Sequence, residues 1–517
     1  MTDSTVAATQ SILPVPGSWP WRIALVVILT ALADWLFFRQ AIGVSLTLFV
    51  LTVAASVLLA NRIDANHREL LLYSGILVAA VLPSIEDFNV ISGLMAALGI
   101  GCFALGATAA LKGGLIERVV AVAWFLTSGP LQFFRDLPLV QQWARQRGAP
   151  VSSTALKGWI VPLAFGAVFV ALFAAANPLI ANWLTQWSAQ ESLDQFDTLR
   201  LMFWFGAVIV VWAFVCVCGR FTFPGLDRAV ARHDLRPELL RSAAADLDTP
   251  NVDGRLDASS NPIFNDAAIT RSLVLFNLLF AVQTALDINY LWAGAALPDG
   301  MTYASYAHRG AYPLIVTALL AAAFVIVAMR PGSNAERSPL MRALVFLWVG
   351  QNVLLVVSAM LRLNLYVAIY LLTYWRVAAF IWMLIVAVGL VLIVVRIVTY
   401  RSNAWLISAN ALVLALTLYT CCFVNFANLV ARYNVDHARA SATAGLPIDL
   451  TYVISLGAQA IPAIDRYLAA NPRMNPAYFR EQRDALAARH AMATTNWRGW
   501  TFRDWRLTRY LENAKQP

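Results

Sequence analysis

A series of polar side chains in an otherwise apolar stretch has the clearest spacing for binding chemistry. The series comprises Gln351, Arg362, Tyr366, Tyr370, Thr373 and Arg376. From Arg362 onward the steps are three or four residues, and Gln351 precedes Arg362 by eleven, so on a helix all six would share one face. Because polar side chains are costly in apolar surroundings, this stripe should line a cavity or a contact between helices. Two interpretations follow: a binding site, or hydrogen bonds between helices with both arginines at lipid head groups.

A second group of candidate binding residues lies in the segment 293–311. It comprises Asp299, Tyr303, Tyr306, His308 and Arg309. Arginine and histidine beside tyrosines suit an anionic group such as a phosphate or a carboxylate, because they can hold it with charge-assisted hydrogen bonds. Tyrosine is also common where a membrane meets water, so an interfacial anchor is the alternative interpretation.

A carboxylate just before these groups could complete a site. Asp287 follows Gln283 by four residues, so the two side chains share a helical face. Solvation near the end of an apolar stretch is the simpler explanation for Asp287. We nevertheless expect Arg362 or Arg376 to converge with the segment 303–309 on one outward-facing polar pocket. The reason is that a guanidinium at membrane depth needs an acceptor or water, and Asp287, Asp299 and tyrosyl oxygens are the nearby candidates by topology.

The sequence contains no recognisable enzyme signature. Motifs of zinc proteases, serine hydrolases and nucleotide-binding loops are absent. The five histidines are far apart and fall on both sides of the predicted membrane, so we expect no metal and no cofactor. The five cysteines form no CxxC motif and are expected to be small core residues. These observations do not favour an enzyme.

The elements that must position these residues are apolar helices. Of 517 residues, 60% are hydrophobic and only 13% are charged, whereas soluble domains carry about 25% charged residues. Apolar stretches recur that are long enough to cross a ~30 Å hydrocarbon layer as helices. We therefore predict an all-α polytopic transmembrane helix bundle of about eleven spans. The spans lie near residues 21–38, 42–60, 70–83, 90–111, 158–176, 202–218, 270–288, 312–329, 341–361, 377–396 and 405–424.

Two apolar segments depart from this regular pattern. The third span is expected to be short and to end at Pro83. Residues 119–134 are also apolar, but a Gly-Pro pair interrupts them and an arginine flanks each end. We interpret them as an interfacial or re-entrant piece. If they span the membrane instead, the orientation of everything upstream changes.

Loop charge predicts the orientation. The chain has 38 basic and 29 acidic residues, and the basic residues concentrate in alternate loops, which indicates membrane orientation rather than nucleic-acid binding. Basic loops face the cytoplasm, so residues 112–157 and 219–268 are predicted to be cytoplasmic, as is the N-terminus. The opposite loops, 84–89 and 177–201, are poor in basic residues. Span parity then places the C-terminal tail outside the cytoplasm.

We divide the chain into a transmembrane domain, residues 1–424, and a helical C-terminal tail, residues 425–517. Apolar residues at helical spacing predict a helix over 450–468 that Pro462 kinks. At 497–511, aromatic residues alternate with arginines. This alternation fits either contact with a membrane surface or ordinary packing against the preceding helices.

Several segments together resemble a known bacterial membrane family. They are residues 276–283, 290–292, 299–303, 306–310, 351–352 and 361–363, followed by Tyr366, Tyr370, Thr373 and Arg376. Residues 33–37 and 171–178 are also similar, although the family more often has Asp where Asn177 stands. The family resembled is the one named as domain of unknown function, number 4173. The resemblance implies a multi-pass bacterial inner-membrane protein, and it implies no activity and no functional residues.

Three functions are compatible with these observations. The first is transport or binding of an anionic or lipid-linked solute, such as a lipid head group, through the stripe and the segment 293–311. The second is a membrane scaffold or envelope-maintenance subunit that acts through membrane protein partners. The third is an integral-membrane transferase with a site on the outer face. A stripe sealed between helices would favour the scaffold, and a cavity joining it to both sides would favour transport.

Overall fold

The computed structural model describes residues 19–111, 113–146, 198–217, 266–289, 338–440, 448–471 and 477–514. Within these ranges every regular element is a helix, and no strand is present. This confirms the predicted all-α fold class. The chain divides into two compact units, which we describe separately. The first unit contains the helices before residue 232 together with Asn496–Thr501, and the second contains the remaining helices.

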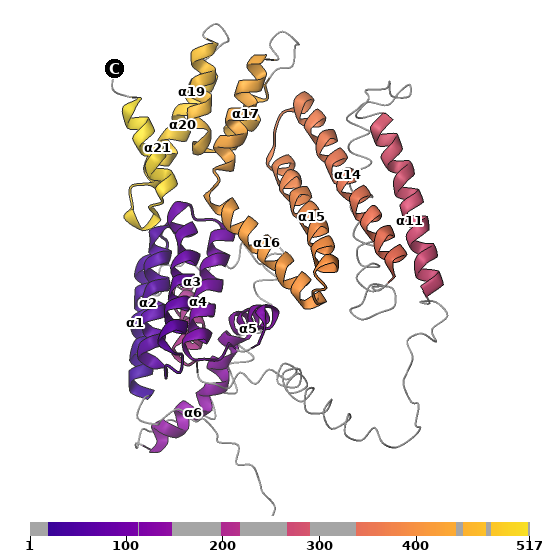
Figure 1. Ribbon diagram of the computed structural model, residues 1–517. Coiled ribbons are helices and arrows are strands. Elements are labelled where there is room, and N and C mark those ends of the chain that lie inside the picture. Colours follow the sequence, from indigo (N-terminus) through magenta and orange to yellow (C-terminus); the bar gives the residue numbers. More distant parts are fainter. Residues whose placement is uncertain are drawn as a thin grey trace, which may run out of the picture. The chain divides into compact units, whose positions relative to one another are not determined.

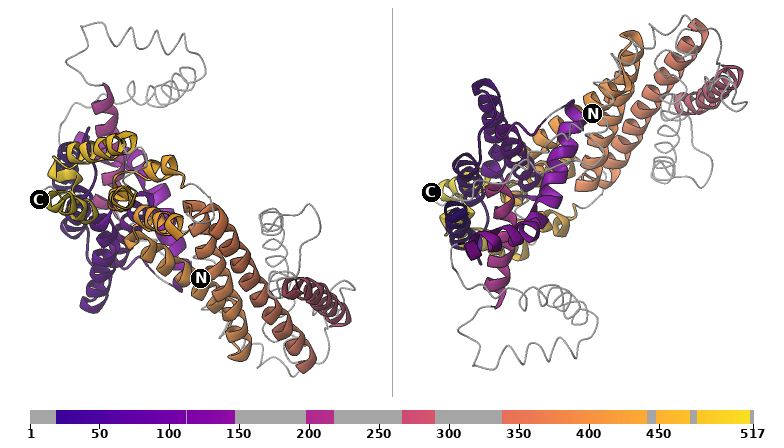
Figure 2. Two further views of the ribbon diagram at one scale, coloured as in Figure 1. Left: turned by 90° about the horizontal axis from the view of Figure 1, so that it is seen from above. Right: turned by 90° about the horizontal axis from the view of Figure 1, so that it is seen from below.

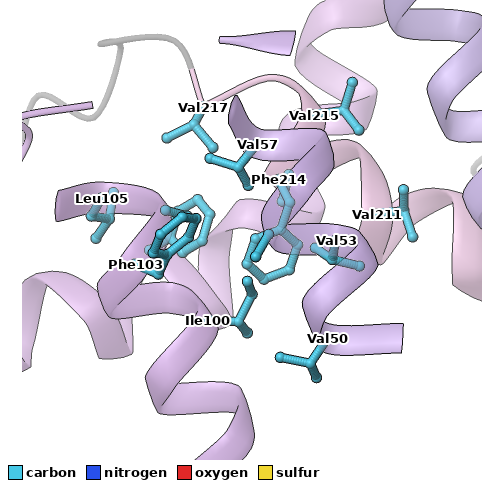
Figure 3. Close-up of a cluster of buried hydrophobic side chains, with 14 of the residues drawn as sticks. Val50, Val53, Val57, Ile100, Phe103, Leu105, Val211, Phe214, Val215 and Val217 are labelled. Atoms are coloured by element: carbon cyan, nitrogen blue, oxygen red, sulfur yellow. The ribbon is translucent and has the colours of Figure 1, made fainter. Parts of the chain in front are cut away.

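The first unit is a bundle of apolar helices closed by a short C-terminal segment (Figure 1). Its elements are α1 (Trp19–Phe37), α2 (Val44–Ala60), α3 (His67–Glu86), α4 (Val90–Ala107), α5 (Leu115–Ser128), the 3₁₀ turn η2 (Gly129–Leu131), α6 (Gln132–Gln146), α9 (Thr198–Val215) and η7 (Trp497–Gly499). Side chains of α2, α4 and α9 meet in its apolar core, where Val57, Phe103 and Phe214 are buried (Figure 3). The core therefore joins helices that are more than 100 residues apart in sequence.

Helix α3 corrects one prediction. It spans His67–Glu86, so it is twenty residues long and runs past Pro83 instead of ending there. At its start, Asn66 and Glu69 cap the helix reciprocally through their side chains and backbone amides. At its end, the amide of Asp87 donates to the carbonyl of Pro83. Proline lacks only its own N–H donor, and its carbonyl still accepts the bond of the next turn, so the helix continues.

The segment expected to be interfacial or re-entrant, residues 119–134, contains a helix break. Helix α5 ends at Ser128, and the 3₁₀ turn at Gly129 and Pro130 separates it from α6. Fourteen residues of helix extend only ~21 Å, which is too short to cross a ~30 Å core. Ala121, Val122 and Phe125 of α5 are buried in the core of the first unit. These dimensions suit an interfacial or re-entrant piece, which remains a prediction.

The membrane-facing part of the second unit is a row of four long helices (Figure 1). They are α11 (Asp266–Asp287), α14 (Pro339–Tyr370), α15 (Tyr374–Val398) and α16 (Asn403–Phe423), and each packs against the next. Figure 2 shows the same row from above and below. Trp348 and Val345 of α14 are fully buried against this row, and Leu273 of α11 meets them. The sequence between α11 and α14 lies outside the described residues.

Among the described residues, eight helices are long and apolar enough to cross a membrane, and α2 is a shorter apolar helix. They coincide with the predicted spans, except that the predicted spans 158–176 and 312–329 lie outside the described residues. The protein is therefore a polytopic membrane protein.

Apart from Asn496–Thr501, which belong to the first unit, the described tail residues form short helices within the second unit. They are α17 (Phe426–Ala440), α18 (Leu450–Ser455), the 3₁₀ turn η6 (Ala458–Ala460), α19 (Ile461–Ala470), α20 (Ala477–Ala493) and α21 (Phe502–Asn513). The predicted helix over 450–468 is thus broken rather than kinked. The break is at Gly457, whose φ of 85° ends the first helix, and Pro462 then starts α19 in its first turn. Ile461 and Ile464 bury this second helix in the tail core.

Candidate functional site

A buried ion pair joins α11 to α14. The guanidinium of Arg362 binds a carboxylate oxygen of Asp287, and the two side chains expose only 7% and 1% of their surface. The amide of Gln283, one helical turn before Asp287, donates to the same carboxylate at 3.0 Å. Asp287 is the last residue of α11, so the pair lies at one end of that helix. Arg362 of the stripe thus contacts Asp287, the carboxylate that could complete a site.

A second polar layer joins the same helices near their middles. The amide of Asn277 on α11 donates to the carbonyls of Leu273, at 2.8 Å, and Leu344, at 3.0 Å. Gln351 on α14 donates in turn to the Asn277 carbonyl at 3.2 Å. Side-chain amides that bind backbone carbonyls across a helix contact are a common means of association in membranes. Gln351 therefore lies at a contact between helices.

The predicted stripe does not lie on one helix. Helix α14 ends at Tyr370, and the chain reverses at Leu371, so Thr373 and Arg376 belong to the start of α15. Leu371 has a φ of 61° with an extended ψ, a conformation that side chains rarely adopt and that spacing alone does not reveal. The prediction of one continuous stripe was therefore wrong at this turn.

The turn nevertheless brings three of its members together. Arg376 folds back over the ring of Tyr366, with 4.5 Å between the guanidinium carbon and the ring centroid. It also donates to the carbonyl of Tyr370 at 2.6 Å and to the carbonyl of Leu371. Arg376 therefore neutralises the carbonyl end of α14, where the helix dipole is negative. The rings of Tyr366 and Tyr370 contact each other at 4.7 Å between centroids, with their planes tilted by 37°.

A tail residue that the sequence did not reveal holds this turn. The side chain of Asn434 on α17 accepts from the amide of Leu372 at 2.7 Å and donates to its carbonyl at 3.0 Å. Asn434 is buried, as is Leu372. This two-bond contact replaces the backbone partners that the reversed chain cannot supply locally. A contact between residues 62 positions apart leaves no local signal in the sequence.

A second charged pair, in the first unit, was also missed. Arg200 on α9 binds both carboxylate oxygens of Asp34 on α1, and the indole of Trp204 donates to the same carboxylate at 2.8 Å. The side chain of Asp34 is only 11% exposed, whereas that of Arg200 is 48% exposed. Arg200 lay in a predicted loop, so its charge was assigned to orientation rather than to a partner.

The other candidate group lies outside the described residues. It comprises Asp299, Tyr303, Tyr306, His308 and Arg309. The expected convergence of this segment with Arg362 or Arg376 therefore remains a prediction. Arg362 binds Asp287 of α11, whereas Arg376 binds the carbonyls at the end of α14. Among the described residues, no group of three His, Cys, Asp or Glu side chains could hold a metal ion.

Comparison with known protein families gives a match over most of the chain. Residues 73–467 match a family described as a domain of unknown function (DUF4153). The resemblance seen in the sequence pointed to number 4173, so the kind of family agrees and the number does not. No curated protein and no solved structure matches the chain.

Proposed function

Because the chain belongs to the family described as a domain of unknown function (DUF4153), whose description assigns no activity, we propose its function from geometry. The protein binds or transports an anionic or lipid-linked solute, and Arg362 is the cation that receives the anionic group. The observation that carries this proposal is the buried ion pair between Arg362 and Asp287. The expected convergence of Arg362 or Arg376 with residues 303–309 belongs to the same proposal.

The energetic cost of the pair supports a functional role. Removing two charges from water costs several kcal/mol per ion, and apolar side chains of similar size often hold helices together equally well or better. Ionisable groups among membrane helices are accordingly rare and occur mainly at solute and proton pathways. The middle layer at Asn277 and Gln351 already joins α11 to α14 without any net charge. A charged pair beside it is therefore more than the helix contact requires.

Charge balance gives the pair a mechanism. In the observed state, Asp287 is the internal counter-ion of Arg362. An anionic group that binds Arg362 takes the place of this carboxylate. Binding of the anionic group then exchanges one partner of Arg362 for another, and release restores the ion pair.

This mechanism predicts different effects for substitutions of the two partners. Purified protein would be reconstituted in liposomes, and uptake of radiolabelled phosphate, sulfate and succinate would be measured in turn. We expect the wild-type protein to take up at least one of these anions. Arg362→Gln should abolish this uptake, whereas Asp287→Asn should retain it, because it removes the competing carboxylate and leaves the cation in place.

Two outcomes would contradict this mechanism. If the wild-type protein moves none of these anions, or if Asp287→Asn and Arg362→Gln change uptake equally, Arg362 is not the anion-receiving partner of the pair. Folding of each variant would be checked by gel filtration. A Gln283→Leu variant serves as a matched control, because it removes a hydrogen bond to Asp287 without removing a charge.

A scaffold is the second candidate function, and one observation favours it. The side chains of Gln351 and Asn277 bind backbone carbonyls across the α11–α14 contact, as expected of a stripe that joins helices rather than lines a passage. In that case the Asp287–Arg362 pair would be a structural contact. Among the described residues, no observation specifically favours a transferase.

We propose that the protein lies in a bacterial inner membrane with its N-terminus in the cytoplasm and its tail outside. Single cysteines in a Cys-free variant test this orientation. Ser242→Cys, in the basic loop 219–268, should resist a membrane-impermeant thiol reagent in intact cells. Phe88→Cys, in the exposed turn between α3 and α4, should react. Labelling of position 242 together with protection of position 88 would reverse the orientation.

A further inference from the structure

A pocket in the tail has the composition of an anion site. Its volume is about 220 Å³, far more than the ~10–15 Å³ that one water needs. Its polar lining includes Asn425, Asn428, Gln459, Arg503, Arg506 and Tyr510. The lining residues include two arginines and no carboxylate. We propose that this pocket binds a phosphate-bearing anion, such as the head group of an anionic phospholipid.

The arginines of the pocket differ in their roles. Arg503 is buried, and its guanidinium donates to the carbonyl of Cys422 at 3.1 Å, which fixes one nitrogen and orients the rest of the group. Arg506 is exposed and lies over the ring of Phe502, at 4.9 Å from the guanidinium carbon to the ring centroid. The buried arginine therefore has a fixed orientation, whereas the exposed one is accessible from solvent.

Three helices begin at this pocket. Asn425 caps α17 by accepting from the Asn428 amide at 3.0 Å, Pro462 lies in the first turn of α19, and Arg503 and Arg506 lie in the first turns of α21. The first turns of three helices thus contribute lining residues, and Arg503 also binds the carbonyl end of α16 at Cys422. Backbone amides at helix starts favour anions, and phosphate groups in particular.

The nearby carboxylates have other partners. Asp504 accepts from Gln459 at 3.0 Å, and Gln459 in turn accepts from Asn425 at 2.9 Å. Asp465 binds Arg483 through two bonds, of 2.8 and 3.0 Å, and accepts from the hydroxyl of Tyr510 at 3.0 Å.

Arg483 balances the charge of Asp465, whereas the neutral amide of Gln459 does not balance that of Asp504, so the two pocket arginines stand against the one carboxylate of Asp504. Burial, together with the charge of Asp465, raises the pKa of Tyr510 to about 12, so this side chain remains neutral at physiological pH. The arginine charges are therefore not cancelled by the tyrosine, and Asn428 adds a side-chain amide that can donate to an anion.

The position along the chain indicates where the anion comes from. Helix α16, an apolar candidate span, ends at Phe423, and the pocket residues Asn425 and Asn428 follow within five positions. The pocket therefore lies where a hydrocarbon span gives way to polar chain, at the depth of lipid head groups. Phe502 and Trp505 are exposed beside Arg506, as is common for aromatic residues at that boundary.

The test uses full-length purified protein and native mass spectrometry. Phosphatidylglycerol is titrated, phosphatidylcholine is the zwitterionic comparison, and inorganic phosphate is the competitor. Arg506→Gln should weaken phosphatidylglycerol binding about tenfold, because it removes one charge-assisted hydrogen bond. Arg509→Gln is the matched control, because Arg509 is also exposed on α21 and covers a ring, that of Trp505, but does not line the pocket. The control should change affinity less than twofold.

The competition experiment distinguishes the two sources of phosphate. Binding of phosphatidylglycerol that inorganic phosphate does not displace identifies a lipid head group, whereas inorganic phosphate that binds as tightly as the lipid identifies a soluble phosphate compound. Either result supports the site. Equal loss in Arg506→Gln and Arg509→Gln, or equal binding of phosphatidylcholine and phosphatidylglycerol, overturns it. The inference is measured as lipid binding that depends on Arg506, whereas the proposed function is measured as anion flux that depends on Arg362, so either can fail or hold independently of the other.

Discussion

Asp287→Ala alone is expected to lower the free energy of unfolding by about 3–5 kcal/mol. The substitution leaves the charge of Arg362 buried without its carboxylate, and the side chain of Arg362 exposes only 7% of its surface. It also removes the acceptor of the Gln283 amide. The loss would be measured as a shift in the midpoint of thermal unfolding of purified protein in one fixed detergent.

The matched variant replaces both partners. Asp287→Leu combined with Arg362→Met removes the charges together and retains apolar volume at the α11–α14 contact. We expect it to unfold within about 1 kcal/mol of the wild-type protein, because replacing a buried ion pair by apolar side chains is often neutral or stabilising. If the double variant is as unstable as Asp287→Ala, the pair is needed for folding, and its cost no longer supports a functional role.

Gly43→Ala is expected to release the segment Asn496–Thr501 from the turn between α1 and α2. A Cβ atom at position 43 would lie 2.5 Å from the carbonyl oxygen of Trp500 and 2.6 Å from the carbonyl carbon of Gly499. Both are backbone atoms that cannot rotate away, and the hydrogen bond of 2.9 Å from the Val44 amide to Trp500 would break with the displacement.

Limited trypsin digestion at Arg498 measures this release. We expect cleavage to accelerate roughly tenfold to a hundredfold, because digestion follows the free energy of local opening and overpacking costs about 1–3 kcal/mol. Gly75→Ala is the control, since a Cβ atom there meets nothing within 4 Å. Unchanged cleavage in Gly43→Ala would mean that the segment does not depend on this close approach.

The spans were predictable because hydropathy and helix length depend on local sequence. The helix boundaries that were predicted wrongly depended on the conformation of particular residues. Pro83 looks like a helix end, yet its carbonyl still accepts from Asp87, so α3 continues. Gly457 looks unremarkable within an apolar pattern, yet its positive φ divides the predicted tail helix. Neither outcome could be read from spacing alone.

The candidate site was predictable in its residue types but not in its arrangement. Arg362 and Asp287 stand out in the sequence because a charged side chain in an apolar helix is energetically costly and needs a partner. The reversal at Leu371 is invisible to spacing, since it depends on two bonds from Asn434 on a later helix. The pairing of Arg200 with Asp34 was missed for a related reason: loop charges were read only as orientation signals.

A density map of the protein in nanodiscs of phosphatidylglycerol, compared with one in phosphatidylcholine to which a transported anion has been added, tests the central claim most directly. We predict additional density within hydrogen-bond distance of the Arg362 guanidinium in at least one of the two maps, with Asp287 displaced from it. If Arg362 binds Asp287 in both maps, and protein side chains alone surround the pair, Arg362 does not receive an anion and the scaffold function is the better account.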